Sequence, residues 1–330
     1  MELILTSAGS YPRIGDSPES QRHRRAYAQH ERAEISDAEW RAVEDEVAQQ
    51  VVREQAEIGL DVVTDGQVRW YDPISHLTRH CEGIQINGLL RYFDTNFYFR
   101  QPVVSGRIRP RERVLRREFE IARAATDRMV KPVLTGPYSL ACGSILEGGY
   151  RNRRELAHAY AEILAQEVAD LVHAGAAVIQ VDEPYLLRHP EDADVVRDGI
   201  AQLAAVRGRA HLALYTHFGD ALPLWDDIMA MPVDLVGFDL TYGPKLVDRI
   251  AEVGAPRSLV LGVVDGRNTK LEARDAVLRI LDRVVPKLEA PVGLGSSCGL
   301  ELLPRDRARA KLENMVAIAR EYAGRKGRPR

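Results

Sequence analysis

The stretch "LALYTHFGD" (212–220) has the form of a buried β-strand that ends in a single polar side chain, His217. Similar short runs rich in apolar and β-branched residues recur along the 330-residue chain, and long amphipathic stretches separate them. There are eight such runs: 3–9, 61–66, 132–137, 176–184, 210–217, 233–240, 258–266 and 290–297. Because these runs are apolar throughout, we expect them to form a parallel sheet that is buried on both faces.

Helical patterns fill the segments between the strands, which makes the predicted fold α/β. The clearest helices are predicted over 37–58, 153–174, 191–206, 270–288 and 304–323. Eight strand–helix units in a chain of this length predict a single (β/α)8 TIM barrel. A doubly wound open sheet is the alternative, but no glycine-rich phosphate-binding motif follows any of the strands.

One segment departs from the alternation of strand and helix. Residues 84–108 are rich in aromatic residues, alternate in polarity and contain the turn signal "ING". We predict an inserted hairpin or extended loop after the second strand, lying as a lid over the C-terminal mouth of the barrel. The barrel domain is predicted to cover 1–324, and the basic residues 325–330 to form a disordered tail.

The composition narrows the cellular context of the protein. A formal net charge of −3 offers no basic surface for nucleic acid or for an anionic membrane. The first residues lack the features of a signal peptide, and no apolar run is long enough to span a bilayer. The three cysteines, Cys81, Cys142 and Cys298, match no disulfide framework. We therefore expect a soluble, cytoplasmic protein with free thiols.

Polar side chains gather at the carboxyl ends of the predicted strands, where barrel enzymes place their chemistry. They are Ser10, Asp65, Gln67, Thr135, Asp182, Glu183, His217, Asp239, Asp265, Arg267, Ser297 and Cys298. Each has a structural alternative when taken singly: Asp182 and Glu183 could cap a helix, and a lone cysteine is most often a small buried apolar residue. Taken together, these side chains predict an active site at this mouth.

Three of the polar residues suggest a metal site. His217, Asp239 and Cys298 end the fifth, sixth and eighth strands, so all three are expected to point into one mouth. Imidazole, carboxylate and thiolate are ligands that Zn²⁺ accepts in tetrahedral geometry. Three protein ligands leave a fourth position open, which is typical of a catalytic zinc rather than a structural one.

Several motifs, in a fixed order, make the chain similar to a known family. They are "GSYPRIG" (9–15), "DVVTDGQVRWYD" (61–72), "RYFDTNFYFRQP" (91–102), "PVLTGPYSL" (132–140), "IQVDEPYL" (179–186), "VDGRN" (264–268) and "SSCGL" (296–300). The chain resembles the cobalamin-independent methionine synthase family. The members of that family are zinc-dependent thiol methyltransferases built on (β/α)8 barrels. Full-length family enzymes carry two barrels, so the resemblance implies a single-barrel member.

The zinc ligands of the family are only partly present. The family binds zinc through a His-x-Cys pair, a Glu and a second Cys. His217 and Cys298 are retained, whereas Gly219 stands where the first Cys belongs. Asp239 occupies the position of the Glu. The resemblance therefore implies one zinc ion per chain on three protein ligands.

Two further departures concern the substrate and the methyl donor. Gln67 replaces a family Glu that helps to hold the substrate amine, which weakens recognition of an ammonium group. Arg267 aligns with a family His that donates a proton to the leaving folate nitrogen. Because arginine is a poor general acid, a corrinoid or a corrinoid protein is the better candidate for the donor.

The resemblance implies a homocysteine S-methyltransferase that acts in methionine biosynthesis on a small-molecule thiol. Asp182 and Arg267 are the expected catalytic residues. The expected substrate-binding residues are Ser10, Gln67, Asp182, Trp70 and Asp65. Asp182 would hold the amine, the backbone near Ser10 the carboxylate, and Trp70 with the aromatic segment 92–99 a wall over the mouth.

Three alternatives stay open at this point. One is a zinc enzyme that alkylates a different thiol or uses another electrophile. The second is a metal-free enzyme like uroporphyrinogen decarboxylase, of the same superfamily, in which Arg13, Arg69 and Arg267 bind substrate carboxylates. The third is a catalytically inactive binding barrel, which would be stable but would bind no metal.

Overall fold

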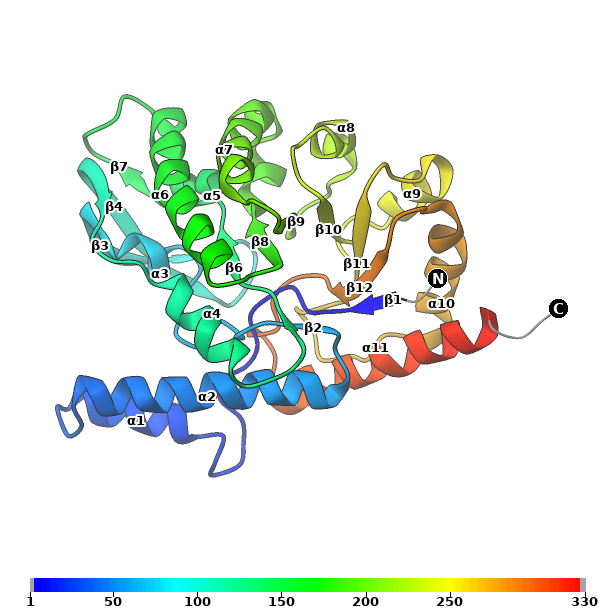
Figure 1. Ribbon diagram of the computed structural model, residues 1–330, viewed down its shortest axis with the longest axis horizontal. Coiled ribbons are helices and arrows are strands. Elements are labelled where there is room, and N and C mark those ends of the chain that lie inside the picture. Colours follow the sequence, from blue (N-terminus) through cyan, green and yellow to red (C-terminus); the bar gives the residue numbers. More distant parts are fainter. Residues whose placement is uncertain (1–2, 327–330) are drawn as a thin grey trace.

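Eight parallel strands close into a barrel in the computed structural model, which describes residues 3–326 (Figure 1). The strands are β1 (Leu3–Leu5), β2 (Val62–Val63), β5 with β6 (Met129–Val130 and Val133–Thr135), β8 (Val178–Asp182), β9 (His211–Thr216), β10 (Leu235–Asp239), β11 (Ser258–Val264) and β12 (Val292–Ser296). All eight strand runs expected from the sequence are present, so the predicted (β/α)8 barrel is confirmed.

The barrel closes through short strands from the first half of the chain. β1 pairs with β12 in parallel, and an isolated bridge joins Thr6 to Val62 of β2. β2 in turn pairs with β5, which continues into β6. The third strand is split at Lys131-Pro132, where the proline has no N–H to contribute to the ladder.

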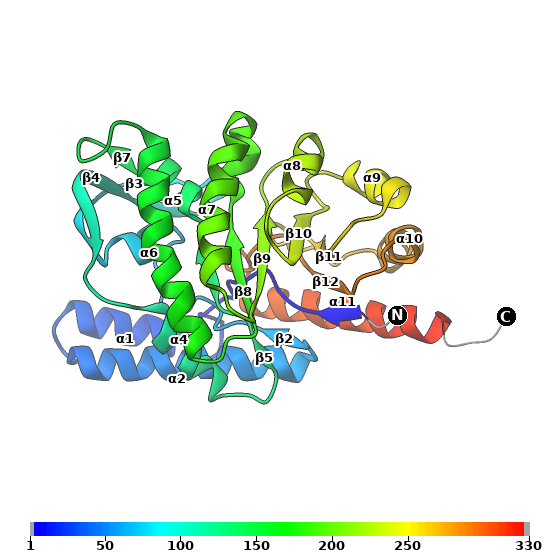
Figure 2. The same cartoon turned by 45° about the horizontal axis from the view of Figure 1, so that its top comes forward.

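Helices cover the outside of the barrel, as Figures 1 and 2 show. They are α1 (Arg22–Glu31), α2 (Asp37–Ile58), α3 (Ser75–Thr78), α4 (Leu115–Arg123), α5 (Pro137–Gly143), α6 (Arg153–His173), α7 (Ala193–Val206), α8 (Trp225–Met229), α9 (Leu246–Val253), α10 (Arg274–Val284) and α11 (Arg305–Lys326). Within residues 3–326, no helix combines the length and the apolar character needed to cross a membrane.

Local sequence signals explain why the long helices begin and end where they do. Ser36 and Glu39 form a capping box at the start of α2, and Gly59 ends the helix with φ of 107°. Asn152 caps α6 by accepting a hydrogen bond from the N–H of Glu155 at 3.0 Å. Gly175 adopts φ of 91° just after α6, as a glycine C-cap requires.

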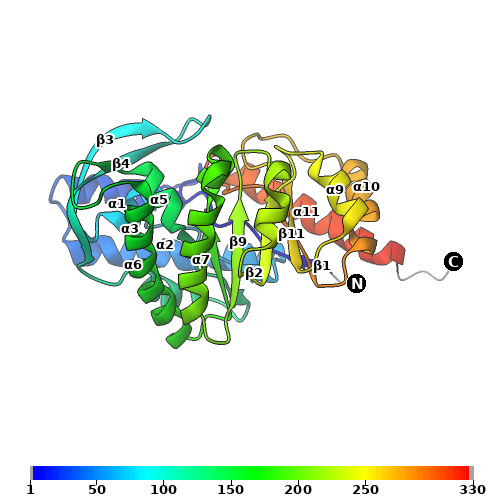
Figure 3. The same ribbon diagram turned by 90° about the horizontal axis from the view of Figure 1, so that it is seen from above.

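The predicted insertion is an antiparallel hairpin of β3 (Cys81–Arg91) and β4 (Tyr98–Pro110). It extends a few residues beyond the predicted 84–108 at both ends. A short strand that the sequence did not indicate, β7 (Ile145–Leu146), pairs with β4 in parallel. Figure 3 shows the hairpin on the side of the barrel toward which the β9 arrow points, so it lies near the C-terminal mouth.

The C-terminal boundary differs from the prediction. α11 continues through Lys326, so Arg325 and Lys326 are helical rather than part of a disordered tail. An ion pair between Arg325 and Glu321, one turn earlier, accompanies this extension at 2.7 Å. The last four positions of the predicted tail, 327–330, lie outside the described residues.

Candidate active site at the C-terminal mouth

The three predicted metal ligands lie at the same end of the barrel. His217 directly follows β9, Asp239 ends β10 and Cys298 follows β12, and all three side chains are buried. They share an electrostatic environment: burial, Glu301 and Asp239 raise the pKa of Cys298 and Arg267 opposes that rise, while burial and Arg267 lower the pKa of His217. The barrel topology thus gathers onto one rim residues that are far apart in the sequence.

Two polar atoms on this rim have no protein partner. Both His217 Nδ1 and Asp239 Oδ2 are buried, and neither forms a hydrogen bond with another group of the protein. The other Asp239 oxygen accepts hydrogen bonds from the N–H of Thr241 at 3.0 Å and of Tyr242 at 3.0 Å. Burial lowers the pKa of His217 to about 3, so its imidazole is neutral and available as a ligand. Buried polar atoms without partners are costly, so these two are the atoms of the rim that are free to contact an additional group.

The side chains of this rim are of the types that bind zinc, but they are not positioned to hold it. Imidazole, carboxylate and thiol are the donors that zinc accepts, and two of them carry an unused atom. However, no three His, Cys, Asp or Glu side chains within residues 3–326 lie close enough together to hold a metal ion. Zinc binding by His217, Asp239 and Cys298 would therefore require the three side chains to move toward one another.

Leu187 fills the space that the side chain of the family's first cysteine would occupy at position 219. A Cβ placed on Gly219 would lie 2.7 Å from Leu187 Cβ and 3.1 Å from Leu187 Cδ1. Leu187 belongs to the 3-10 helix Pro184–Arg188, which follows β8. The loss of the family cysteine is thus matched by tight packing at that position.

Gly219→Cys is therefore expected to destabilise the protein by ~1–3 kcal/mol, the usual cost of overpacking. In a Leu187→Gly background the same substitution should cost at least ~1 kcal/mol less, because the obstructing Cβ and Cδ1 of Leu187 are gone. Denaturant unfolding of the four proteins in this double-mutant cycle measures the coupling. Equal costs of Gly219→Cys in both backgrounds would show that Leu187 does not exclude a side chain at 219.

The two acidic residues after β8 have different roles. The completely buried Glu183 accepts hydrogen bonds from Tyr138 N at 2.9 Å, Ser139 N at 2.8 Å and Ser139 Oγ at 2.6 Å. It therefore caps the N-terminus of α5 and not, as the structural alternative had it, the helix that begins at Pro184, where Glu183 makes no side-chain capping bond. Asp182 accepts a hydrogen bond from Gln180 Nε2 at 2.6 Å, and burial raises its pKa to about 7. Only Asp182 is left to bind a ligand.

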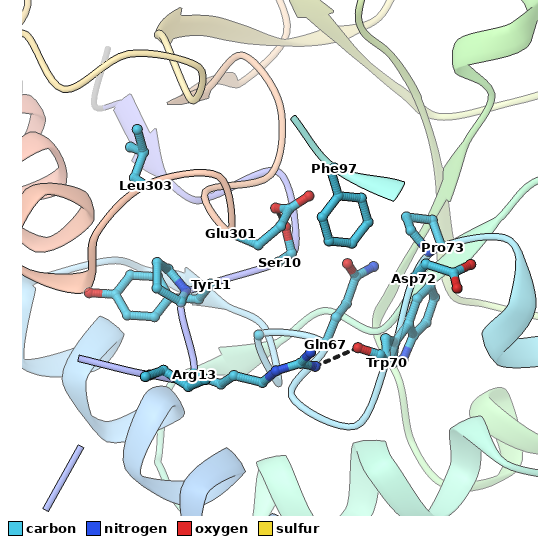
Figure 4. A pocket seen from close by; sticks show the side chains of 13 residues that line it. Ser10, Tyr11, Arg13, Gln67, Trp70, Asp72, Pro73, Phe97, Glu301 and Leu303 are labelled. Atoms are coloured by element: carbon cyan, nitrogen blue, oxygen red, sulfur yellow. Dashed lines mark hydrogen bonds between the residues drawn. The ribbon is translucent and has the colours of Figure 1, made fainter. Parts of the chain in front are cut away.

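A cavity of about 320 Å³ lies beside the rim and holds three of the predicted substrate-binding residues (Figure 4). Ser10, Gln67 and Trp70 line it, together with Arg13, Asp72, Phe97 and Glu301. Asp65 and Asp182 are not among the described residues that line this cavity. Asp65 is buried behind it and accepts a hydrogen bond from Gln67 N at 3.1 Å.

Trp70 forms a rigid wall of the cavity. Its indole N–H donates to Glu118 Oε2 at 3.1 Å, and its ring stacks on His76 with centroids 4.6 Å apart. His76 also contacts the Glu118 carboxylate, at 3.0 Å. Since both partners are buried, the indole is fixed in orientation, which is what a positioning wall requires.

Aromatic rings from the hairpin close the mouth above Cys298. Tyr92, Phe93 and Phe99 pack with Phe218 and Cys298 in one buried cluster. Phe93 and Phe218 both have positive φ, 53° and 64°, which is unusual for bulky residues and typical of functional sites. Aromatic rings of the predicted hairpin thus cover the Cys298 thiol, which is fully buried.

Arg267 lies on the rim but is held as a permanent cation. Its guanidinium donates to Asp265 at 2.9 Å and to Thr241 Oγ1 at 2.8 Å, and it lies over the Tyr242 ring at 5.0 Å. Burial opposes the charge, but the hydrogen bond to Asp265 and the neighbouring Asp239 carboxylate raise the pKa of Arg267 above its usual value. Arg267 is thus suited to bind an anion and unsuited to donate a proton.

Two residues of this site were not predicted from the sequence. Phe218 covers the neighbouring His217, and its ring lies 4.6 Å from the imidazole. Glu301, which lines the cavity, follows the motif "SSCGL" directly. Their positions next to His217 and to that motif are the signals that could have indicated them. Arg69, by contrast, pairs with Asp45 of α2 and is not among the described residues lining the cavity.

Sequence comparison connects the chain to proteins of similar length. Residues 3–321 match the catalytic domain of cobalamin-independent synthases. The methionine synthase of Saccharolobus solfataricus is 32% identical over 336 residues, covering 98% of this chain and 97% of that protein. The methionine synthase of Sulfolobus acidocaldarius is 29% identical over 334 residues, covering 98% and 94%. These relatives, like this chain, have room for one barrel.

Solved structures extend the likeness to the fold. A B12-independent methionine synthase from Shewanella sp. W3-18-1, in complex with selenomethionine, is similar with a TM-score of 0.80 at 19% identity, covering 98% of this chain and 99% of that one. A methyltransferase from Methanosarcina mazei gives a TM-score of 0.66 at 13% identity, covering 98% and 94%. These structures show the same fold. The match along residues 3–321 and the relative of 32% identity confirm the resemblance first seen in the motifs: the chain belongs to the cobalamin-independent methionine synthase family.

Proposed function

We propose that this chain transfers a methyl group to the thiol of homocysteine. Its membership in the family and the names of its relatives support methyl transfer and methionine formation. The observation that carries the proposal is the pair of buried atoms without partners, His217 Nδ1 and Asp239 Oδ2, on the same rim as the buried Cys298. The neighbouring cavity is large enough to hold an amino acid beside this rim.

We further propose that His217, Asp239 and Cys298 hold one zinc ion. When bound, zinc lowers the pKa of a coordinated thiol and so supplies a thiolate at neutral pH. The chain itself would exclude water, through the rings of Tyr92, Phe93 and Phe218 that cover this rim. Trp70 would hold the substrate in line with the donor.

The reaction balances as a simple displacement. The substrate thiol would lose its proton to solvent water, and the sulfur would then form a bond to the methyl carbon. The bond between that carbon and the donor breaks, and its electron pair leaves with the donor. Asp182 would bind the substrate amine, and the backbone near Ser10 the carboxylate.

The chemistry of Arg267 favours a corrinoid donor. A folate nitrogen must be protonated as it leaves, whereas a corrinoid leaves without a proton. Arg267 occupies the position of the family's proton donor, and its contacts with Asp265 and Thr241 keep it charged. A methylated corrinoid, free or bound to a protein, is therefore the donor we propose.

Methionine formation from homocysteine, with methylcobalamin or 5-methyltetrahydrofolate as donor, tests this proposal on the zinc-loaded protein. We expect turnover with methylcobalamin and a rate at least ~100-fold lower with the folate, since a general acid typically contributes 10²–10⁴. Equal or faster turnover with the folate would overturn the choice of donor. No methionine with either donor would overturn homocysteine methylation by these donors.

A further inference from the structure

Two carboxyl groups line the cavity, Asp72 and Glu301. Asp72 is occupied by hydrogen bonds from Ile74 N, from Ser75 N and Oγ and from Arg100 N, whereas Glu301 has no part in the roles assigned so far. Glu301 lies in the turn after β12 and folds back so that it accepts a hydrogen bond from Ser10 Oγ. Gly299 permits this fold, because a Cβ at position 299 would collide with Ser10 Oγ and with the Glu301 carboxylate. Figure 4 shows Glu301, Ser10 and Gln67 meeting in the same part of the cavity.

Glu301 lacks an ion-pair partner in the described part of the chain. The cation that acts on it is Arg13, but the Arg13 guanidinium donates its hydrogen bonds to the carbonyls of Val68 and Trp70. Burial raises the pKa of Glu301 to about 7, and Glu301 in turn contributes to the raised pKa of Asp182. A carboxylate held in this way is prepared for a cation from outside the chain.

The other walls of the cavity suit an organic cation. Gln67 is neutral, so it supplies no charge of its own. Trp70 and Phe97 present aromatic surface, which favours an ammonium group over a strongly hydrated metal ion. A metal ion would need several further oxygen, nitrogen or sulfur ligands, and the described residues show no such group here.

We infer that Glu301 is a second carboxylate, besides Asp182, that recognises the ammonium group of the substrate and so selects an amino-acid thiol over a simple thiol. Glu301 acts on Asp182 electrostatically. This inference rests on the proposed function. Glu301 thereby supplies, from the turn after β12, a negative charge that the neutral Gln67 does not provide. The charge-assisted hydrogen bond it forms would discriminate for the amine.

Binding of the methylated product tests this inference without any turnover. L-methionine and 4-(methylthio)butanoate, which lacks the amine, are titrated into the zinc-loaded protein by calorimetry. The wild type should bind L-methionine ~10- to 100-fold more tightly, as expected for a hydrogen bond between charged groups. Glu301→Gln should lower this preference by weakening L-methionine and leave the affinity for 4-(methylthio)butanoate unchanged. Glu289→Gln, at an exposed position, is the matched control.

Moving the negative charge from position 301 to position 67 distinguishes recognition of the ammonium group by Glu301 from a structural role of Glu301. Glu301→Gln combined with Gln67→Glu should restore part of the preference for L-methionine, since the negative charge returns to the same cavity. A wild type that does not prefer L-methionine, or a Glu301→Gln variant that weakens both ligands equally, would overturn the inference. If the preference is found but no methyl transfer occurs, the proposed function fails while the ammonium site stands.

The pH dependence of L-methionine affinity gives a second readout. The charged and titratable groups that act on Glu301 or share its field are Arg13, Asp182, Cys298 and Tyr92. Because the pKa of Glu301 is about 7, its carboxylate is charged above that pH and protonated below it. Affinity should therefore fall as the pH drops below about 7, and Glu301→Gln should flatten that fall.

Discussion

Replacing Cys298 by alanine is expected to abolish zinc binding and to slow thiol methylation by at least ~100-fold, because an uncoordinated thiol is only a few per cent ionised at neutral pH. The sulfur is the rim's one soft ligand, and the overpacked position 219 offers no second cysteine. Metal content by elemental analysis and methionine formation measure the two effects on the same preparation.

Cys142→Ala is the matched control for this prediction. Cys142 lies in α5, outside the rim, and should keep both zinc and activity. Far-UV circular dichroism and the unfolding midpoint show whether the Cys298→Ala protein is folded. A folded Cys298→Ala protein that retains zinc and wild-type activity would contradict the zinc–thiolate proposal, and a wild type that binds no zinc would contradict the metal site itself.

The largest effect on stability is expected at Glu183. Glu183→Ala leaves Tyr138 N and Ser139 N buried without an acceptor, and it opens a void at the end of α5. Each unsatisfied buried group costs ~1–3 kcal/mol, so the free energy of unfolding should fall by about 4 kcal/mol. Denaturant unfolding followed by circular dichroism measures this loss.

Two further variants sharpen the prediction at Glu183. Gly136→Ala should also destabilise the protein. A Cβ at position 136 would collide with the Glu183 carboxylate and displace it from Tyr138 N and Ser139 N. Glu191→Ala, at an exposed position, should stay within ~0.5 kcal/mol of the wild type, as surface substitutions generally do. A Glu183→Ala protein as stable as the wild type would show that the carboxylate does not hold α5 in place.

Elements with strong local signals were predicted closely. The predicted helix 37–58 coincides with α2, because the capping box at Ser36 and the glycine at 59 define both of its ends. α5 was not predicted, since its seven residues depend on a carboxylate that arrives from β8. The hairpin was indicated by its turn and its alternation, whereas its third strand, β7, is only two residues long and carries no pattern.

The sequence by itself determined the barrel and the set of residues at its mouth. Apolar strands alternating with amphipathic helices have few ways to bury their surfaces, and parallel strands in a barrel bring their carboxyl ends to one rim. His217, Asp239 and Cys298 could therefore be placed together from their positions alone. Family motifs at the same strand ends added their expected roles.

Only the tertiary structure decided what each side chain at the mouth is free to do. It committed Glu183 to α5, filled the space beside Gly219 with Leu187, and turned Glu301 toward Ser10. These outcomes depend on packing and hydrogen bonds between segments that are distant in the chain. Local periodicity and spacing carry no information about such contacts, because each is set by the shape and polarity of a partner that the fold supplies.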